Sequence, residues 1–440
     1  MSSNSVGQVP DTRRRRTRRH VLAAGAGALC VSTCAVAQSD LVTAVKGGRP
    51  LLHMHYRIEL VDDEANDLDD ASASTLRTAF GYQTGEFFGF SARILAENVL
   101  HVFADDFTVP GDTPNPTNDI VADPEGTEVD EAFLQYTGLP DTRIRVGRQY
   151  LTYRKAPLHR FIGTVPWRQN WQSMDAVAVT NTSIPNLTAN YAYVHNVNRI
   201  FGENNPNPNL ADSPMSSHFI NLQYSGLPIG SLEGFYYRLD YDNDSLPAPF
   251  TDRQTIGFKL QGSREVSTGL KALYLAEYSH QTDIAENATA FESANQYHLA
   301  GGFSYDLKSP IATGLTLKVG YEVLESDNGI SFSTPLATVH AFQGFADRFI
   351  GFPGGGVEDL YVLGKTKLPF GLNLFARYHD FSIEASDADY GSEIDFQLTK
   401  KIDKFTFALK HATFFGDEAT EAGNIGIDKS VTWFFVDFVM

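Results

Sequence analysis

The sequence predicts an all-β fold: a transmembrane, antiparallel, up-and-down β-barrel of about 18 strands that occupies residues 38–440. Three observations lead to this prediction. β-patterned runs alternate with turn-rich breaks, the breaks alternate between short and long, and no later stretch has the roughly 18 consecutive apolar residues that a membrane-spanning helix needs. The mean hydropathy is slightly negative, which suits a barrel because half of each strand faces water.

Residues 1–37 have the features of a cleaved export signal. Arg13–Arg19 is basic, Val21–Thr33 is apolar, and Ala35–Ala37 has the small-residue pattern that precedes cleavage, here before Gln38. An arginine pair also resembles a twin-arginine signal, but that route carries folded cargo, so the general secretory route is favoured. Both cysteines lie in this segment, so no disulfide is expected after cleavage. Export of a barrel predicts the bacterial outer membrane as its location.

Eighteen segments have the alternating pattern and the length of tilted, membrane-crossing strands. They are expected to begin near Leu51, Thr75, Phe87, Val129, Thr142, Asp175, Leu187, Ser217, Leu232, Thr255, Leu270, Tyr297, Leu315, Val357, Leu372, Ser392, Phe405 and Val431. The last segment places Phe434, Val436 and Phe438 on one face, which suits the terminal strand of an outer-membrane barrel.

The connections alternate in length along the chain. Short ones include 83–86, 138–141, 183–186, 225–230 and 368–371, and long ones include 62–74, 104–127, 151–173, 198–214 and 325–356. An up-and-down barrel with both termini in the periplasm predicts this alternation, with tight turns inside and long loops outside. A two-sheet sandwich has no reason to sort its loops in this way.

Charged residues share one face of each strand, and that face must be the lumen, because an arginine or lysine facing lipid at the midplane costs about 2–4 kcal/mol. The lumen cations are expected to be Arg57, Arg77, Arg93, Arg143, Arg145, Arg238, Lys259, Lys271, Lys318, Arg377 and Lys410. The same face is expected to carry Glu59, Glu97, Glu131, Asp240, Glu277 and Glu322. Either these charges form ion pairs that brace the wall, or unpaired arginines make a path for anions; both can hold for different residues.

Two long loops are too apolar to lie free in water. Residues 154–171 combine Arg154, Arg160 and Arg168 with aromatic side chains, and residues 339–352 carry Phe342 and Phe345 at roughly helical spacing. We expect one or both loops to fold into the barrel and narrow it. Aromatic residues near strand ends, among them Tyr150, Phe381 and Trp433, are expected to form interfacial girdles.

Other classes of function find little support. The formal net charge of −18 argues against a nucleic-acid partner. No nucleophile elbow, zinc-protease motif or paired-cysteine motif occurs, so neither an enzyme nor a cofactor is expected. His53 and His55 share one face of a strand, but a pair of histidines in a watery lumen is more often a polar lining than a metal site. No metal is therefore predicted.

Four blocks of the sequence resemble the alginate export family of outer-membrane barrels. They are EAFLQYTGLPDTRIRVGRQ (131–149), RFIGTVPWRQNWQSMDAV (160–177), YAYVHNVNRIFG (191–202) and HAFQGFADRFIGFPGGGVEDLYV (340–362). The resemblance implies an 18-stranded barrel, narrowed by loops, with an arginine-rich conduit that passes the polyuronate alginate out of the cell. Only Arg143, Arg145 and Arg148 can be matched to its binding residues, and the mixed Arg and Glu of the predicted lumen depart from a purely positive conduit.

The sequence therefore predicts an outer-membrane channel that passes anionic solutes, with export of a polyuronate such as alginate as the sharpest version. The alternatives are a nonspecific diffusion porin for small hydrophilic solutes and, with less support, a barrel enzyme or an adhesive barrel. The expected partners are the anionic solute or polysaccharide, outer-membrane lipid and lipopolysaccharide, and the barrel-assembly machinery during insertion.

Overall fold

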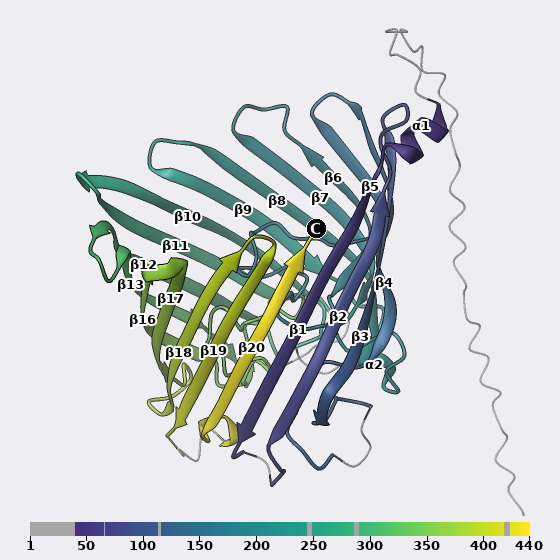
Figure 1. Cartoon of the computed structure of the whole chain (residues 1–440). Coiled ribbons are helices and arrows are strands. Elements are labelled where there is room, and N and C mark those ends of the chain that lie inside the picture. The colour runs from purple at the N-terminus through teal and green to yellow at the C-terminus, as the bar shows by residue number, and fades with distance from the viewer. Residues whose placement is uncertain (1–39, 66, 113–115, 244–248, 286–289, 418–422) are drawn as a thin grey trace, which may run out of the picture. The chain divides into compact units, whose positions relative to one another are not determined.

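Eighteen antiparallel strands form one sheet that closes on itself (Figure 1). Each barrel strand pairs with its neighbours in sequence, and the first pairs with the last, so that Tyr56 of β1 is opposite Val436 of β20. Closure removes the free edges that an open sheet would present, which is what a bilayer demands of a spanning sheet. The predicted fold class is confirmed.

This computed structural model describes residues 40–440 except 66, 113–115, 244–248, 286–289 and 418–422. The predicted export signal lies outside the described residues. Within them, no helix has the length and apolar character needed to cross a membrane.

Every expected strand segment corresponds to one strand of the barrel, in order. The strands are β1 (Arg49–Asp63), β2 (Ala71–Gln83), β3 (Phe90–Asp106), β4 (Gly126–Leu139), β5 (Thr142–Gln149), β6 (Ser173–Asn181), β7 (Leu187–Asn198), β8 (Asp212–Leu227), β9 (Gly230–Leu239), β10 (Arg253–Ser267), β11 (Leu270–Asp283), β12 (Ser293–Lys308), β13 (Thr313–Leu324), β16 (Val357–Lys367), β17 (Leu372–Ser382), β18 (Asp389–Ile402), β19 (Phe405–Gly416) and β20 (Lys429–Val439).

Short elements lie between these strands. The connection 325–356 contains a small hairpin, β14 (Ser326–Asp327) and β15 (Ile330–Ser331), which the sequence did not predict. The helices are α1 (Leu41–Lys46), α2 (Pro208–Ala211), η1 (Pro369–Gly371) and η2 (Gly423–Gly426). α1 begins where the carboxylate of Asp40 accepts a hydrogen bond from the backbone N–H of Thr43, 2.7 Å away.

The connections are sorted by length at the two ends of the barrel. Two residues link β4 to β5, β8 to β9, and β10 to β11, whereas residues 150–172 and 325–356 form long loops at the opposite end. In Figure 1 the C-terminus and α1 lie at the short-turn end, and the long loops gather at the bottom. The predicted alternation of loop lengths is confirmed.

The wall has an apolar outer face and a polar inner face. Residues of outward parity, such as Phe80, Ile256 and Leu299, are more than half exposed, while Arg57 and Glu59 of inward parity are almost fully buried. An apolar surface of this extent needs an apolar surrounding, and a bilayer supplies it. The structure is therefore that of a transmembrane barrel.

Arg238 corrects the predicted lumen face. In β9, Phe235 and Tyr237 are buried inside the barrel, so Arg238 lies on the outer side, and its guanidinium pairs with Asp240 (Nη2–Oδ2, 2.9 Å). The outward position is tolerated because β9 ends at Leu239, where the wall meets the long loops and water. Its partner Asp240 was assigned to the lumen with it.

The predicted aromatic girdle is partly wrong. Phe381 and Trp433 are 1% exposed and lie inside the barrel, where they pack against loop residues. The hydroxyl of Tyr150 donates a hydrogen bond to Asp130 on the inner wall. Phe381 and Trp433 have the strand parity of the lumen face. A position near a strand end does not reveal on which face of the wall a ring lies.

Candidate functional site

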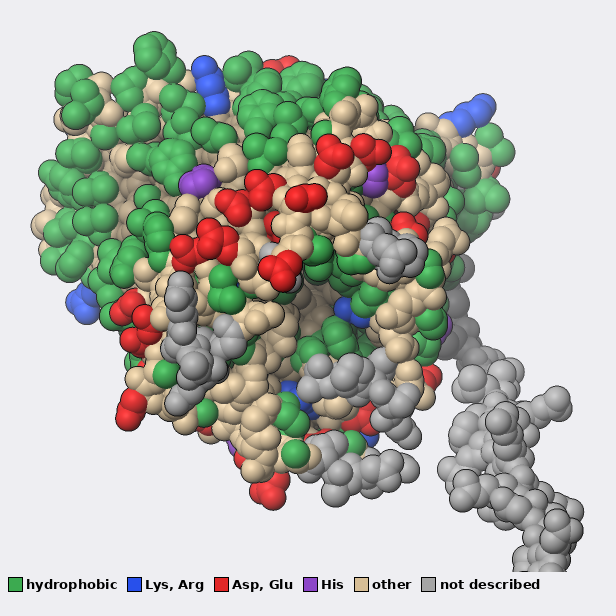
Figure 2. Space-filling view, turned by 90° about the horizontal axis from the view of Figure 1, so that it is seen from below, with side chains coloured by type: hydrophobic (Ala, Val, Ile, Leu, Met, Phe, Trp, Pro, Cys, Tyr) green, Lys and Arg blue, Asp and Glu red, His purple; other side chains and the backbone are tan. Residues whose placement is uncertain are grey.

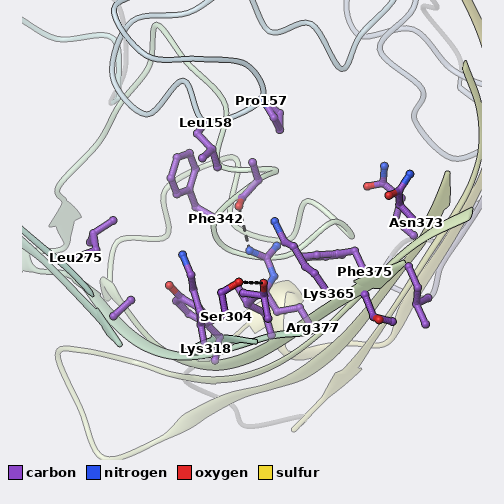
Figure 3. Close-up of a pocket in the computed structure, with 18 of the residues that line it drawn as sticks. Pro157, Leu158, Leu275, Ser304, Lys318, Phe342, Lys365, Asn373, Phe375 and Arg377 are labelled. Atoms are coloured by element: carbon purple, nitrogen blue, oxygen red, sulfur yellow. Dashed lines mark hydrogen bonds between the residues drawn. The ribbon is translucent and has the colours of Figure 1, made fainter. Parts of the chain in front are cut away.

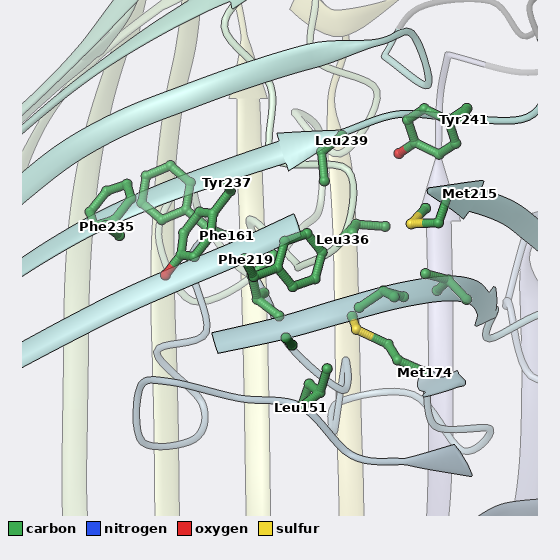
Figure 4. Close-up of a cluster of buried hydrophobic side chains, with 14 of the residues drawn as sticks. Leu151, Phe161, Met174, Met215, Phe219, Phe235, Tyr237, Leu239, Tyr241 and Leu336 are labelled. Carbon is green, nitrogen blue, oxygen red and sulfur yellow. The ribbon is translucent and has the colours of Figure 1, made fainter. Parts of the chain in front are cut away.

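Two long loops fold into the interior of the barrel: loop A (residues 150–172) and loop B (residues 325–356). Leu151 and Phe161 of loop A and Leu336 of loop B pack in one buried cluster with wall residues such as Phe219 and Phe235 (Figure 4). The ring centroids of Phe161 and Phe235 are 4.6 Å apart. The apolar residues that make these loops unsuited to water are the ones that hold them against the inner wall.

Loops A and B also bond to each other. The backbone N–H of Gly163 donates to the carbonyl of Leu336 (2.9 Å), and the side chain of Gln172 donates to the same carbonyl (3.0 Å). Arg160 donates to Gln343 of loop B and to Glu322 of β13, both at 2.8 Å. The two loops therefore form one inward-folded unit fixed to the wall.

Arg154 anchors the start of loop A. Its guanidinium contacts Glu233 of β9 (Nε–Oε2, 3.0 Å) and Glu277 of β11 (Nη2–Oε1, 2.6 Å). Burial opposes the charge, but the two carboxylates raise the pKa of Arg154 above its ordinary value, so it stays protonated. One guanidinium thus neutralises two carboxylates from different strands.

A third connection, loop C (residues 107–125), completes the anchoring. Its Asp123 is fully buried and pairs with Arg57 of β1. Arg168 of loop A pairs with Glu59 beside it (Nη1–Oε2, 3.2 Å). Asp123 could not be singled out from the sequence, because one acid in a long acidic loop looks like a solvated residue.

Loop B is fixed to β19 through a row of three buried side chains that contact one another. Asp347 accepts a hydrogen bond from His340 Nδ1 (2.8 Å), and His340 Nε2 contacts Nζ of Lys410. Burial lowers the pKa of His340 to about 4, so its imidazole is uncharged at neutral pH. Trp167 stacks on the ring of His340 with centroids 3.5 Å apart, and Phe345 also stacks with His340, with centroids 5.1 Å apart.

Four of the predicted lumen cations and all three predicted loop arginines are therefore used in ion pairs. Their partners lie on the wall or on the inward loops: Arg57 with Glu59 and Asp123, Arg77 with Glu97 and Asp130, Arg93 with Glu131, Arg154 with Glu233 and Glu277, Arg160 with Glu322, Arg168 with Glu59, and Arg377 with Asp395. For these residues the bracing interpretation describes the geometry.

A smaller set of lumen cations has no such partner. Among the residues that the structure describes, no carboxylate oxygen lies within 4.0 Å of the side-chain nitrogens of Arg143, Arg145, Lys259, Lys318 or Lys365. Among the described residues, Arg145 donates to Gln135 (2.9 Å) and lies over the ring of Phe133. Lys365 was missed in the sequence, although its spacing within β16 gives it the parity of the lumen face. These five residues are called the free cations below.

Lys259, Lys318 and Lys365 face a chamber with a volume of about 720 Å³ (Figure 3). Loop residues Pro157, Leu158 and Phe342 face the chamber from the side opposite Lys318 in that view. Arg377 also lines the chamber while it donates to Asp395 and to the carbonyl of Ala341. The chamber thus has cations on the wall and apolar side chains on the loops.

A second cavity, of about 460 Å³, lies toward the long-loop end and includes Trp167, Arg168 and Phe352 in its lining. Seen from the long-loop side, this end of the barrel carries many acidic side chains (Figure 2). Loops A and B border both cavities. An approaching solute therefore meets acidic loops first, and the free cations only beyond the inward-folded unit.

Replacing Arg154 by methionine tests the anchoring. We expect the free energy of unfolding to fall by about 3–5 kcal/mol, because the buried carboxylates of Glu233 and Glu277 would lose their partner. Urea unfolding of the refolded barrel, followed by tryptophan fluorescence, measures the change. Lys155→Met removes the exposed neighbouring cation and is expected to change little. Equal stability of both variants would contradict the anchoring role.

The fold and its interior define a class: a transmembrane β-barrel with a charged lumen that is divided by inward-folded loops. No family model matches this chain, and no curated protein matches it. Its fold is similar to solved structures of three bacterial proteins, each matched over 90% of this chain. Acinetobacter baumannii OccAB2 has 14% identity, 98% of its own chain covered and a TM-score of 0.65. Pseudomonas aeruginosa OccK1 (OpdK) has 10% identity, 99% of its own chain covered and a TM-score of 0.65. P. aeruginosa OccK9 (OpdG) has 12% identity, 99% of its own chain covered and a TM-score of 0.67. At this identity the likeness concerns the fold.

Proposed function

We propose that this protein is an outer-membrane channel for small anionic solutes, and not an enzyme. The single observation that carries the proposal is the contrast between paired and free charges in the lumen. The carboxylates that meet the inward loops are paired with arginines, whereas the free cations have no carboxylate partner among the described residues. The uncompensated charge at the chamber wall is therefore positive, which favours anions.

The fold supports the location and the kind of protein. One of the similar structures is described as the outer membrane protein OpdK from P. aeruginosa, and another is of OpdK with vanillate. Vanillate is a carboxylate, so a monocyclic carboxylate is a suitable probe for this chain too. Cleavage before Gln38, insertion by the barrel-assembly machinery and contact with lipopolysaccharide stay predictions from the sequence.

Export of a polyuronate such as alginate is the second form of the proposal. The four blocks that resemble the alginate export family favour it, and repeated carboxylates would suit several free cations in succession. The packed loops favour a small solute instead, because a polymer needs a continuous path and loops A and B are bonded to each other and to the wall. A nonspecific diffusion porin would use the same lumen without preference.

Zero-current potentials in planar bilayers test the proposal. With a KCl gradient across the wild-type channel, we expect the zero-current potential to have the sign that reports a preference for chloride over potassium. Liposome swelling with galacturonate, vanillate, alginate oligomers and neutral galactose then separates the two forms of the proposal. Faster entry of the small carboxylates than of galactose supports the small-anion channel, and passage of the oligomers supports the polyuronate form. A preference for potassium over chloride would overturn the proposal. Equal rates of entry for galactose and galacturonate would instead indicate a nonspecific porin.

A further inference from the structure

Three potential metal ligands meet on the inner wall near the short-turn end of the barrel: His53, His55 and Asp437. His53 Nε2 is 2.5 Å and His55 Nδ1 is 3.2 Å from the same oxygen of Asp437, and the three candidate ligand atoms lie within 4.8 Å of one another. The sequence shows only the two histidines, which are 384 and 382 residues away from the carboxylate. The third ligand is what distinguishes this cluster from a polar lining.

We propose that His53, His55 and Asp437 bind a divalent transition-metal ion of the Zn²⁺ type. Two imidazole nitrogens and one carboxylate oxygen are a common set for such ions, and water from the lumen can fill the remaining position. Zinc bonds of about 2.0–2.2 Å place neighbouring ligand atoms a little over 3 Å apart, so small side-chain rotations from the present positions are enough. All three ligands project from strands, which limits how far they can separate.

Asp437 supplies the negative charge at the site, and the guanidinium nearest to it, that of Arg77, has carboxylate partners of its own. Arg77 lies beside His53 (Nη1–Nδ1, 3.0 Å), and Arg77 pairs with both Glu97 and Asp130. A metal on Nε2 puts the proton of a neutral His53 ring on Nδ1, so the contact with Arg77 must lengthen, and Arg77 keeps its two carboxylate partners.

Aromatic rings hold the two histidines in place. Trp171 of loop A meets the ring of His53 edge-on, with centroids 5.4 Å apart. Phe435 lies 5.1 Å from the ring of His55. Fixed ring orientation lowers the entropy lost on binding a metal.

The site would join the first strand to the last. His53 and His55 belong to β1 and Asp437 to β20, and these strands close the barrel by pairing with each other. A bound ion would therefore link the two strands whose pairing closes the barrel. An ion that binds only the folded form must also stabilise that form. This inference does not depend on which solute the channel passes, because its readouts are metal binding and stability.

Calorimetric titration of Zn²⁺ into the refolded barrel, made without a histidine tag, tests the site. We expect one ion per chain and a higher urea midpoint with Zn²⁺ present. Asp437→Asn and His55→Gln are each expected to lower the affinity at least about tenfold and to abolish the increase in midpoint. His280→Gln, which removes an outward-facing histidine of β11, is the matched control and should bind Zn²⁺ as the wild type does.

A measurement without variants covers the case in which a substitution prevents folding. Zn²⁺ should protect His53 and His55 of the wild-type barrel from modification by diethyl pyrocarbonate, as peptide mass spectrometry would show, while His280 stays reactive. No binding to the wild type, no protection, or the same affinity in Asp437→Asn as in His280→Gln would each overturn the proposal.

Discussion

Deleting residues 158–166 from loop A is expected to raise the single-channel conductance about threefold. The segment carries Phe161 and Arg160, which hold the inward-folded unit to the wall, and Leu158, which lines the chamber. An unobstructed barrel of 18 strands encloses a water-filled channel, so the loops and not the wall set its narrowest section. Conductance in symmetric KCl across planar bilayers is the measurement.

A change outside the inward-folded unit serves as the control for this experiment. Ser386 and Asp387 are exposed in the connection between β17 and β18, and replacing both by glycine is expected to leave the conductance unchanged. The double substitution Leu158→Ala and Phe342→Ala removes bulk from the chamber lining without shortening a loop, and it should give an intermediate increase. If the 158–166 deletion conducts like the wild type, loops A and B do not restrict the channel.

The double substitution Lys318→Glu and Lys365→Glu is expected to change the ion preference of the channel from anions to cations. Both lysines face the chamber without a carboxylate within 4.0 Å among the described residues. Reversing one charge about 4 Å from an ion changes its energy by about 2 kcal/mol even at the dielectric constant of water. Two reversals are therefore enough for at least about a tenfold fall in the chloride-to-potassium permeability ratio, and the zero-current potential should change sign.

Lys308→Glu and Lys401→Glu together make the matched control, because they change the total charge equally at the short turns. Lys308 has an 83% exposed side chain, and Lys401 is also exposed. We expect the control to keep the sign of the potential. The same change in both double variants would mean that total charge, and not the free cations of the lumen, sets the preference.

Strand positions could be predicted from the sequence because their signal is local. Alternation of apolar and polar residues needs only positions two apart, and the length of a connection is read directly from the chain. Parity alone placed Arg57, Arg77 and Lys318 on the inner wall. It was insufficient for Arg238, because the end of a strand reaches water, where an outward charge is tolerated.

The roles of the lumen charges could not be predicted, because their partners are distant in the sequence. Arg160 and Glu322 are separated by 162 residues, and Arg154 and Glu277 by 123. An unpaired arginine and an anchoring arginine look alike until the partner is known. The same holds for an acidic residue: Asp123 of loop C is buried against Arg57, and that partner is distant in the sequence.

The sequence by itself determined the closed barrel, the order and parity of its strands, and the two loops too apolar to remain in water. Only the tertiary structure decided which charges are free, how loops A and B lock together, and that Asp437 joins His53 and His55. The physical reason is the range of the interactions. Strand formation follows from the pattern of neighbouring residues, whereas ion pairs, loop anchors and metal ligands form between segments that only the closure and inward folding of the chain bring together.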